Sequence, residues 1–310
     1  MISTMYQVKR PFSCELVPIR TLKYNVMQWG TPKKDHPSLL MVHGWMDVGA
    51  SFQFVVDALK QDRHVIAPDW RGFGLTDSGG ADQFWFPDYL ADLDALIDHF
   101  HSHSPIDLVG HSMGGNVVMM YAGIRPERVR RLINLEGFGL AQSKPSQAPK
   151  RYADWMDQTK KLHRGEFSLK TYLTVEAVAQ RLMKTNPRLS LDKAQWLAQH
   201  WAQVDDKGEW RILGEAAHKV TSANIYRLEE VLACFERITA PTLSVHASDD
   251  SMSKWWSESY SLKEYLERVE RVERVPNISS HQLKDCGHML HHDQPIALAQ
   301  LIEDFLSPTP

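Results

Sequence analysis

Gly110-His-Ser-Met-Gly-Gly115 is the stretch of sequence that decides the fold. It follows the apolar run Ile106-Asp-Leu-Val109 and opens a segment with a helical pattern. A strand, the pattern Gly-x-Ser-x-Gly and a helix, in that order, are typical of a nucleophile elbow, a sharp turn in which two backbones nearly touch. Glycine is needed on either side of the bend because a Cβ atom would collide there. We therefore expect Ser112 at the apex, in a strained conformation that presents its hydroxyl outward.

Short apolar runs alternate with helical patterns on both sides of this turn. The runs have the composition of strands buried on both faces, and the segments between them place apolar residues at helical spacing. The runs span residues 38–43, 64–68, 106–109, 129–135 and 241–246, and the helical patterns include 50–59, 87–100 and 295–305. This alternation predicts an α/β fold with a mostly parallel, doubly wound sheet. Two leading strands with no helix between them, at 12–18 and 22–29, predict an antiparallel edge.

The alternation is interrupted in the middle of the chain. Residues 142–151 form a polar link with two prolines, and from there to about residue 238 the pattern is helical, with no buried-strand run. We therefore predict one α/β core domain made of residues 1–140 and 239–310. A helical cap, residues 141–238, is inserted between two of its strands.

Composition and charge argue against several classes of function. The 310 residues include 35 basic and 38 acidic ones, and a net charge of −3 gives no support to nucleic-acid binding. No apolar run is long enough to span a bilayer, and the N-terminus lacks the apolar core of a secretory signal. The three cysteines, Cys14, Cys234 and Cys286, are far apart and odd in number, so no disulfide framework is implied. We expect a cytoplasmic protein, and the sequence leaves a homo-oligomer open.

A serine hydroxyl becomes a strong nucleophile only beside a base that an acid orients. Asp250 is the acid we favour, because it follows the strand that ends at His246 and so lies at the carboxyl edge of the sheet. Its neighbour Asp249 is an alternative, and both could instead be loop or helix-capping residues. Glu136 is a second alternative for the acid, since it lies at the end of the preceding core strand.

The base is expected further along the chain, in a loop before the last helix. His288 follows a glycine there and can reach back over the sheet edge. His291 and His292 lie closer to the helix, where we expect them to be solvated or to cap it. The run His291-His-Asp293 could suggest a metal site, but no other residues supply ligands at a recognised spacing, so we predict no metal and no cofactor.

An oxyanion hole requires two backbone N–H groups. Met113 should supply one, because it follows the nucleophile at the N-terminus of the elbow helix, where the helix dipole favours negative charge. Trp45 should supply the other, because Gly44 lets the loop after His43 bend toward the site. The same loop must face the substrate, so Trp45 and Met46 are also the predicted substrate-binding residues.

These motifs, together with Asp69-Trp-Arg-Gly-Phe-Gly74, occur in the order found in α/β-hydrolases, and the chain resembles that superfamily over nearly its full length. The stretches His43-Gly-Trp-Met-Asp47 and Leu135-Glu-Gly-Phe-Gly139 are similar to the serine hydrolase-like branch. The chain departs from the family twice. Ala247 replaces a usual glycine, which leaves the choice between the two neighbouring aspartates open, and Thr76 replaces a usual serine.

The resemblance implies a serine hydrolase that cleaves uncharged carboxylic esters of small to medium acyl chain through an acyl-enzyme. Relatives that use an elbow carboxylate, such as epoxide hydrolases, are disfavoured by Ser112. Two alternatives stay open: hydrolysis of a carbon–carbon bond in a diketone, and a ligand-binding member of the fold with low turnover. Large side chains of the cap could line an acyl pocket, but cap core is the more common use of such residues. They are Trp155, Met156, Met183, Trp196, Trp201 and Trp210.

Overall fold

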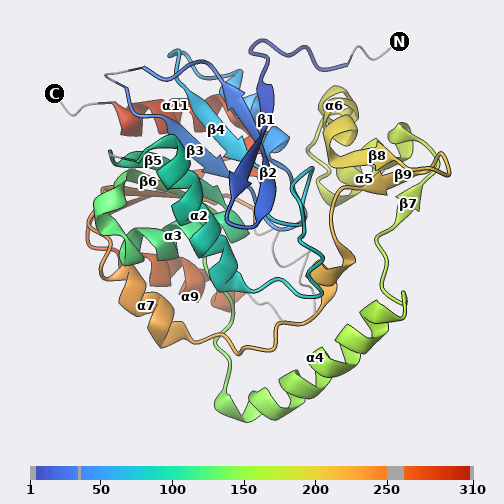
Figure 1. The fold of residues 1–310 in the computed structure, drawn as a ribbon. Coiled ribbons are helices and arrows are strands. Elements are labelled where there is room, and N and C mark those ends of the chain that lie inside the picture. Colours follow the sequence, from blue (N-terminus) through green and yellow to red (C-terminus); the bar gives the residue numbers. More distant parts are fainter. Residues whose placement is uncertain (1–4, 34–35, 103, 250–261, 308–310) are drawn as a thin grey trace.

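A sheet of eight strands runs through the centre of the molecule (Figure 1). In this computed structural model, which describes residues 5–33, 36–102, 104–249 and 262–307, the strand order is β1-β2-β4-β3-β5-β6-β10-β11. β2 pairs antiparallel with β1 and β4, and the other neighbours are parallel. The α/β fold with a mostly parallel sheet is confirmed. The strands span Ser13–Ile19 (β1), Leu22–Trp29 (β2), Leu39–Val42 (β3), Val65–Pro68 (β4), Ile106–His111 (β5), Val129–Leu135 (β6), Thr242–Ala247 (β10) and Ile278–Leu283 (β11).

Side chains of the central strands alternate between two apolar cores, one on each face of the sheet. In β3, Leu39 and Met41 join one core, and Leu40 and Val42 join the other. All four are fully buried. This burial on both faces is the reason that the sequence of β3 is a continuous apolar run rather than an alternating one.

Helices cover both faces. α1 and α11 pack on the core that contains Leu39, whereas α2, α3, α7 and α9 pack on the core that contains Leu40. The predicted helix over 50–59 is divided, since its first turn is a 3₁₀ helix, η1. These elements span Gly49–Phe52 (η1), Gln53–Val56 (α1), Phe86–Phe100 (α2), Met113–Ile124 (α3), Pro126–Arg128 (η2), Leu228–Phe235 (α7), Leu262–Val272 (α9), Leu290–Asp293 (α10) and Pro295–Leu306 (α11).

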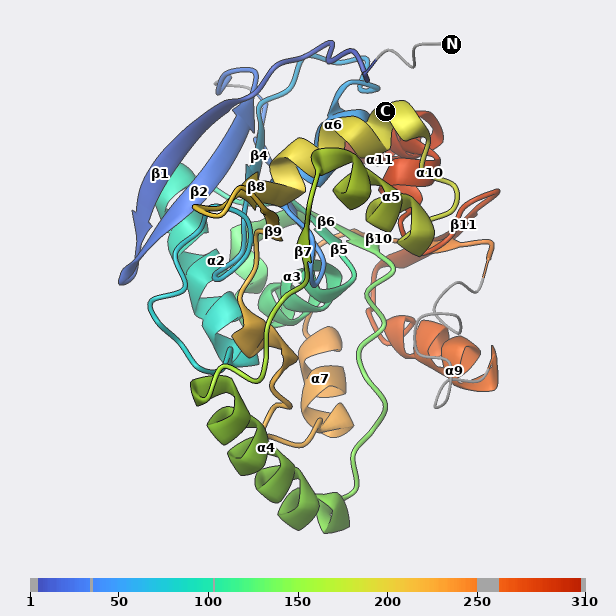
Figure 2. The same ribbon diagram turned by 90° about the vertical axis from the view of Figure 1, so that its right-hand side faces the viewer.

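The segment predicted as a helical cap, 141–238, also contains a small sheet. Its strands, in the order β7-β9-β8, have only two or three residues each and show no apolar alternation, so they could not be predicted from the sequence. α4 stands apart from the central sheet in both views (Figures 1 and 2). The remaining elements span Pro145–Gln147 (η3), Ala148–His163 (α4), Thr171–Tyr172 (β7), Val175–Thr185 (α5), Leu191–Trp201 (α6), Ala202–Val204 (β8), Trp210–Ile212 (β9) and Ala216–Lys219 (η4).

Contacts at several points attach this segment to the core. A bridge pairs Phe73 with Gly214, and the ring of His218 is stacked between Phe73 and Phe84, with ring centroids 3.7 and 3.8 Å away. Near the end of the cap segment, α7 packs closely on α3. A Cβ atom on Gly123 of α3 would lie 1.9 Å from a carbonyl oxygen of α7. Within the described ranges, no helix is both long and apolar enough to cross a membrane.

Candidate active site

The elbow is formed where β5 ends and α3 begins. Ser112 occupies the single position between them, with φ 53° and ψ −112°, a backbone conformation that is costly for a residue with a side chain. A Cβ atom on Gly110 would lie 2.3 Å from the carbonyl oxygen of Gly114, and one on Gly114 would lie 2.4 Å from that of Val42. The two glycines therefore allow the close approach of backbones that the sequence pattern predicted.

A chain of polar contacts connects Ser112 with residues far along the sequence. The Nε2 atom of His288 lies 2.9 Å from the Oγ atom of Ser112. On the other side of the same ring, Nδ1 lies 3.1 Å from Oε2 of Glu136. Serine, imidazole and carboxylate in contact form the arrangement that lets a ring remove the hydroxyl proton while the acid fixes its tautomer.

Glu136 is held rigidly in this position. It follows β6 directly, adopts φ 58°, and is 3% exposed. Its Oε1 atom accepts hydrogen bonds from the backbone N–H of Ala247, at 2.6 Å, and from the hydroxyl of Tyr265, at 3.5 Å. One carboxylate oxygen is thus fixed by the neighbouring strand, which leaves the other directed at His288.

The two aspartates weighed as the acid have different outcomes. Asp249 forms an ion pair with Arg188, in which both side chains are more than 40% exposed. Its carboxylate is therefore directed at the α5–α6 connection. Asp250, the acid favoured from the sequence, lies outside the described residues. The carboxylate that the structure brings to His288 is Glu136, the rival from the end of the preceding strand.

The loop after β3 lies against the nucleophile. A Cβ atom on Gly44 would lie 3.1 Å from the Cβ atom of Ser112, so the loop passes in van der Waals contact with it. Among the described residues, the backbone N–H groups of Trp45 and Met113 have no hydrogen-bond acceptor. Both amides thus remain free for a ligand oxygen, as an oxyanion hole requires. The side chain of Trp45 is 51% exposed beside them.

The loop is also connected to the cap segment. The indole N–H of Trp201, at the end of α6, donates to the carbonyl oxygen of Met46 at 3.1 Å. Trp196 is 7% exposed and packs edge-on against Phe54, which makes it part of the apolar core. Met156 is 49% exposed. The large residues of the cap thus differ in environment. Trp196 packs in the apolar core, whereas Met156 is exposed to solvent.

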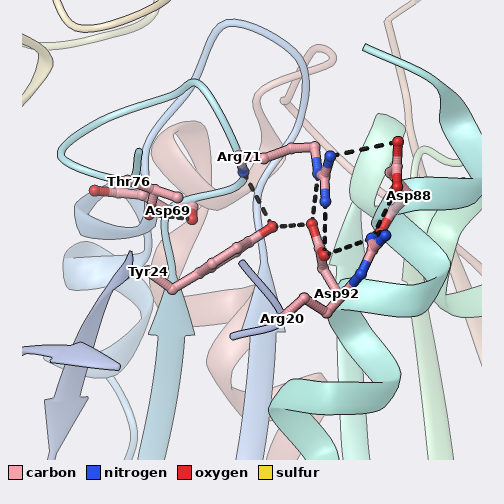
Figure 3. A network of polar contacts seen from close by, with 7 residues as sticks. All are labelled: Arg20, Tyr24, Asp69, Arg71, Thr76, Asp88 and Asp92. Carbon is pink, nitrogen blue, oxygen red and sulfur yellow. Dashed lines mark hydrogen bonds and ion pairs between the residues drawn. The ribbon is translucent and has the colours of Figure 1, made fainter. Parts of the chain in front are cut away.

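The loop at residues 69–77, part of which is drawn in Figure 3, is hydrogen-bonded to the segment that follows β3. Asp69 is buried and accepts hydrogen bonds from the backbone of Gly49 and Leu75 and from the side chain of Asn25. The Thr76 hydroxyl donates to the carbonyl oxygen of Asp69 at 2.7 Å and accepts from the backbone of Asn25. A serine hydroxyl could make the same two bonds, which explains why threonine is compatible with this position.

The expectation that His291 and His292 are solvated or capping is wrong. They are 0% and 3% exposed, because α10 turns their rings inward onto Asp47 and Ser51. His111 joins them from the end of β5, where its ring lies 4.4 Å from that of His291. The sequence held no signal for this cluster, since its members come from three segments at unrelated spacings.

Comparison with known proteins shows the family of the chain. The sequence profile of the alpha/beta hydrolase fold family matches residues 37–295. The chain is 25% identical over 288 residues to the serine hydrolase-like protein of Danio rerio, which covers 90% of this chain and 84% of that protein. It is 26% identical over 278 residues to cis-3-alkyl-4-alkyloxetan-2-one decarboxylase of Shewanella oneidensis, covering 87% and 82% of the two chains. The thioesterase domain from the curacin biosynthetic pathway superposes with a TM-score of 0.80 at 24% identity, over 95% of this chain and 99% of that one.

The chain therefore belongs to the alpha/beta hydrolase fold family, and it is a hydrolase. Within the family it resembles the serine hydrolase-like branch, as its motifs predicted, because relatives in zebrafish, Dictyostelium and mouse carry that description.

Proposed function

We propose that the chain is a serine hydrolase that cleaves uncharged carboxylic esters of small to medium acyl chain. The observation that carries this proposal is the continuous contact from Ser112 through His288 to Glu136, next to two unpaired amides. In the proposed reaction, His288 accepts the proton of Ser112 as the hydroxyl oxygen attacks the ester carbonyl. The alcohol leaves with that proton, and water activated by His288 then hydrolyses the acyl-enzyme.

Glu136 is proposed as the acid that orients His288. A carboxylate on Nδ1 keeps the proton on that nitrogen, so the lone pair of Nε2 faces the nucleophile. The amides of Trp45 and Met113 would bind the oxyanion of the tetrahedral intermediate, and no metal or cofactor takes part in these steps. Trp45 and Met46 would contact the acyl or alcohol group, because their loop lies against Ser112.

The names of the relatives bear on the substrate and also keep one alternative open. The oxetan-2-one in the name of the Shewanella relative is a cyclic ester, which supports a substrate with an ester carbonyl, although that relative is named a decarboxylase. A match of 34% identity to 2-hydroxymuconate semialdehyde hydrolase of Pseudomonas covers 33% of this chain and 37% of that protein. Hydrolysis of a carbon–carbon bond is therefore the second candidate.

A fluorophosphonate probe and a series of nitrophenyl esters test the proposal. We expect the probe to label Ser112 in the wild-type protein and to leave Ser112→Ala unlabelled. In the same variant, kcat for the ester should fall by about 10⁶-fold, because the nucleophile and its base act as a unit. A neutral ester should have a higher kcat/KM than its anionic isostere.

Each alternative predicts a different result. A folded wild-type protein that the probe does not label would be a ligand-binding member of the fold, and both hydrolytic proposals would be wrong. Labelling without ester turnover, together with cleavage of a vinylogous diketone, would favour the carbon–carbon hydrolase.

A further inference from the structure

A cluster of ionisable side chains lies buried directly behind the candidate active site. His111, His291 and His292 surround Asp47 and Ser51, and each of the five side chains belongs to a residue no more than 5% exposed. The residues come from the end of β5, from α10 and from the loop and 3₁₀ turn after β3. The steps of ester hydrolysis proposed above use none of these side chains.

The hydrogen bonds fix where the ring protons lie. The Nε2 atom of His111 donates to the carbonyl oxygen of His288 at 2.8 Å, so Nδ1 of the neutral ring carries a lone pair. The Ser51 hydroxyl donates to Oδ2 of Asp47 at 2.9 Å, so it can only accept from the Nε2 atoms of His291, at 3.1 Å, and His292, at 2.5 Å. In their neutral forms, all three rings therefore present a bare Nδ1.

None of these Nδ1 atoms has a hydrogen-bond partner in the described part of the chain, although all are buried. Unpaired lone pairs in an apolar interior are unfavourable unless something binds to them.

Asp47 completes a set of donors suited to a metal ion. Its Oδ2 atom lies 3.6 Å from Nε2 of His291 and accepts a hydrogen bond from the Ser51 hydroxyl. Asp47, His111 and His291 each offer one ligand atom, a carboxylate oxygen or one of the two ring nitrogens, and these three atoms lie within 4.8 Å of one another.

We propose that Asp47, His111 and His291 form a binding site for a divalent transition-metal ion such as Zn²⁺, and that its occupation inhibits the enzyme. Imidazole nitrogen and carboxylate oxygen are the ligands that Zn²⁺ takes in proteins, and three of them leave a fourth position for water. Each ligand is close in sequence to one part of the candidate machinery. Asp47 is two residues after Trp45, His111 precedes Ser112, and His291 is three residues after His288.

We infer inhibition from the closeness of the ligands to the candidate machinery along the chain. The inhibition rests on the proposed hydrolytic function, whereas the binding of the ion does not depend on that function. A bound ion would draw each ligand atom to a coordination distance of about 2.0–2.2 Å. We expect the elbow, the oxyanion loop and the loop of His288 to shift with the ligands, and small displacements in such a site are costly to catalysis. Because the donors are shielded from solvent, we expect inhibition to develop slowly after Zn²⁺ is added.

Two variants test the site itself. His111→Gln and His291→Gln replace each ring with an amide that can still donate where Nε2 donated, but they remove the Nδ1 lone pair. We expect chelator-treated wild-type protein to bind one Zn²⁺ per chain in calorimetry. Each variant should bind Zn²⁺ at least about 10–100-fold more weakly, because even outer-shell partners contribute that much. His163→Gln, which alters an exposed ion pair with Asp82, is the matched surface control and should bind as wild type.

The variant His288→Gln tests whether Zn²⁺ binds instead at the Ser112–His288 pair. If this variant loses the ion while the two buried variants keep it, the ion binds at the Ser112–His288 pair and our proposal is wrong. Wild-type protein that binds no Zn²⁺ at about 0.1 mM would also contradict it, since even weak calcium sites in proteins have dissociation constants of about 0.1–1 mM.

X-ray absorption of the zinc-loaded wild-type protein provides a readout that does not depend on the variants folding. The proposal requires two imidazoles and oxygen ligands at about 2.0–2.2 Å. A shell with a single imidazole would overturn it. Binding with this shell but without loss of ester hydrolysis would retain the site and contradict the inhibition.

Discussion

Two carboxylates, Glu136 and Asp250, can be compared directly as the residue that orients His288. Glu136→Gln should lower kcat by about 10⁴-fold, as loss of the acid does in a serine triad. Ala247 donates to one oxygen of Glu136, so the new amide nitrogen would face Nδ1 of His288 and donate to it. The ring would then carry its proton on Nε2, where it cannot accept the proton of Ser112. Steady-state ester hydrolysis measures the loss.

Asp250→Asn and Asp249→Asn are the controls for this prediction. Asp249 forms a half-exposed ion pair with Arg188, so its variant should stay close to wild-type activity. If Asp250→Asn loses about 10⁴-fold in kcat while Glu136→Gln retains activity, the acid is Asp250 and the contact between Glu136 and His288 is structural.

The sequence could predict that Ser112 and His288 come together, but not which carboxylate contacts the ring. Ser112 lies between a strand run and a helical pattern, the context that a nucleophile elbow requires, and His288 combines the required order with a glycine and a loop. Glu136 and Asp250 both lie between those two residues and both follow a core strand, so order along the chain favours neither. The choice depends on a distance in space that no local pattern contains.

At the scale of elements, the loop at 69–77 depends on one buried charge in α2. Asp92 is fully buried and accepts hydrogen bonds from Nε of Arg71 at 2.6 Å and from Nη2 at 2.8 Å, as well as from the hydroxyl of Tyr24 (Figure 3). Arg20 pairs with it at 3.0 Å. Arg71 begins the turn that carries Phe73 against the cap segment, so this ion pair attaches α2 to the region where core and cap meet.

Asp92→Asn should lower the free energy of unfolding by about 3–5 kcal/mol, because it removes the buried partner of the Arg71 guanidinium and leaves only the partly exposed Asp88 as its countercharge. Asp88→Asn is the matched control, one turn away on the same helix. Asp88 also pairs with Arg20 and Arg71, but its side chain is 26% exposed, so the loss should stay below about 1 kcal/mol. Urea unfolding measures both values, and equal losses would contradict the role assigned to burial.

An element could be predicted from the sequence where it was long enough, or buried enough, to show a regular pattern of apolar residues. Other elements could not be predicted. β3 is a continuous apolar run because both of its faces are covered. The helix α5 shows its N-cap, Thr174, whose side chain accepts a hydrogen bond from the backbone N–H of Ala177. β7, β8 and β9 are too short for a period. The buried positions of His291 and His292 depend on Asp47 and Ser51, more than two hundred residues away in the chain.

For the whole molecule, buried neutral histidines should determine the response to acid. Burial lowers the pKa of His43, His111 and His292, and it lowers that of His218 to about 3. In the unfolded chain each ring has a pKa of about 6.5. Below that pH the unfolded state binds protons that the folded state does not, so stability falls as the pH falls.

The expected loss is large enough to measure. A ring that stays neutral in the folded protein down to pH 5.5 should contribute about 1.4 kcal/mol between pH 7.5 and 5.5. His111, His218 and His292 together should therefore contribute about 4 kcal/mol, which is close to the whole stability of many domains. Burial raises the pKa of Asp69 and of Asp107, so the folded state takes up their protons first and opposes the trend at lower pH. Urea unfolding at several pH values between 7.5 and 5.5 measures the net slope.

His218→Gln isolates one of these contributions. Its ring lies between Phe73 and Phe84, and Nε2 lies 3.2 Å from the carbonyl oxygen of Gly72, so the variant also loses packing between cap and core. That loss is the same at every pH, whereas the titrating group is removed. The stability difference between pH 7.5 and 5.5 should therefore shrink by about 1.4 kcal/mol relative to wild type. An unchanged difference would mean that His218 is protonated in the folded protein, and that the stacked ring is a cation held by two aromatic faces.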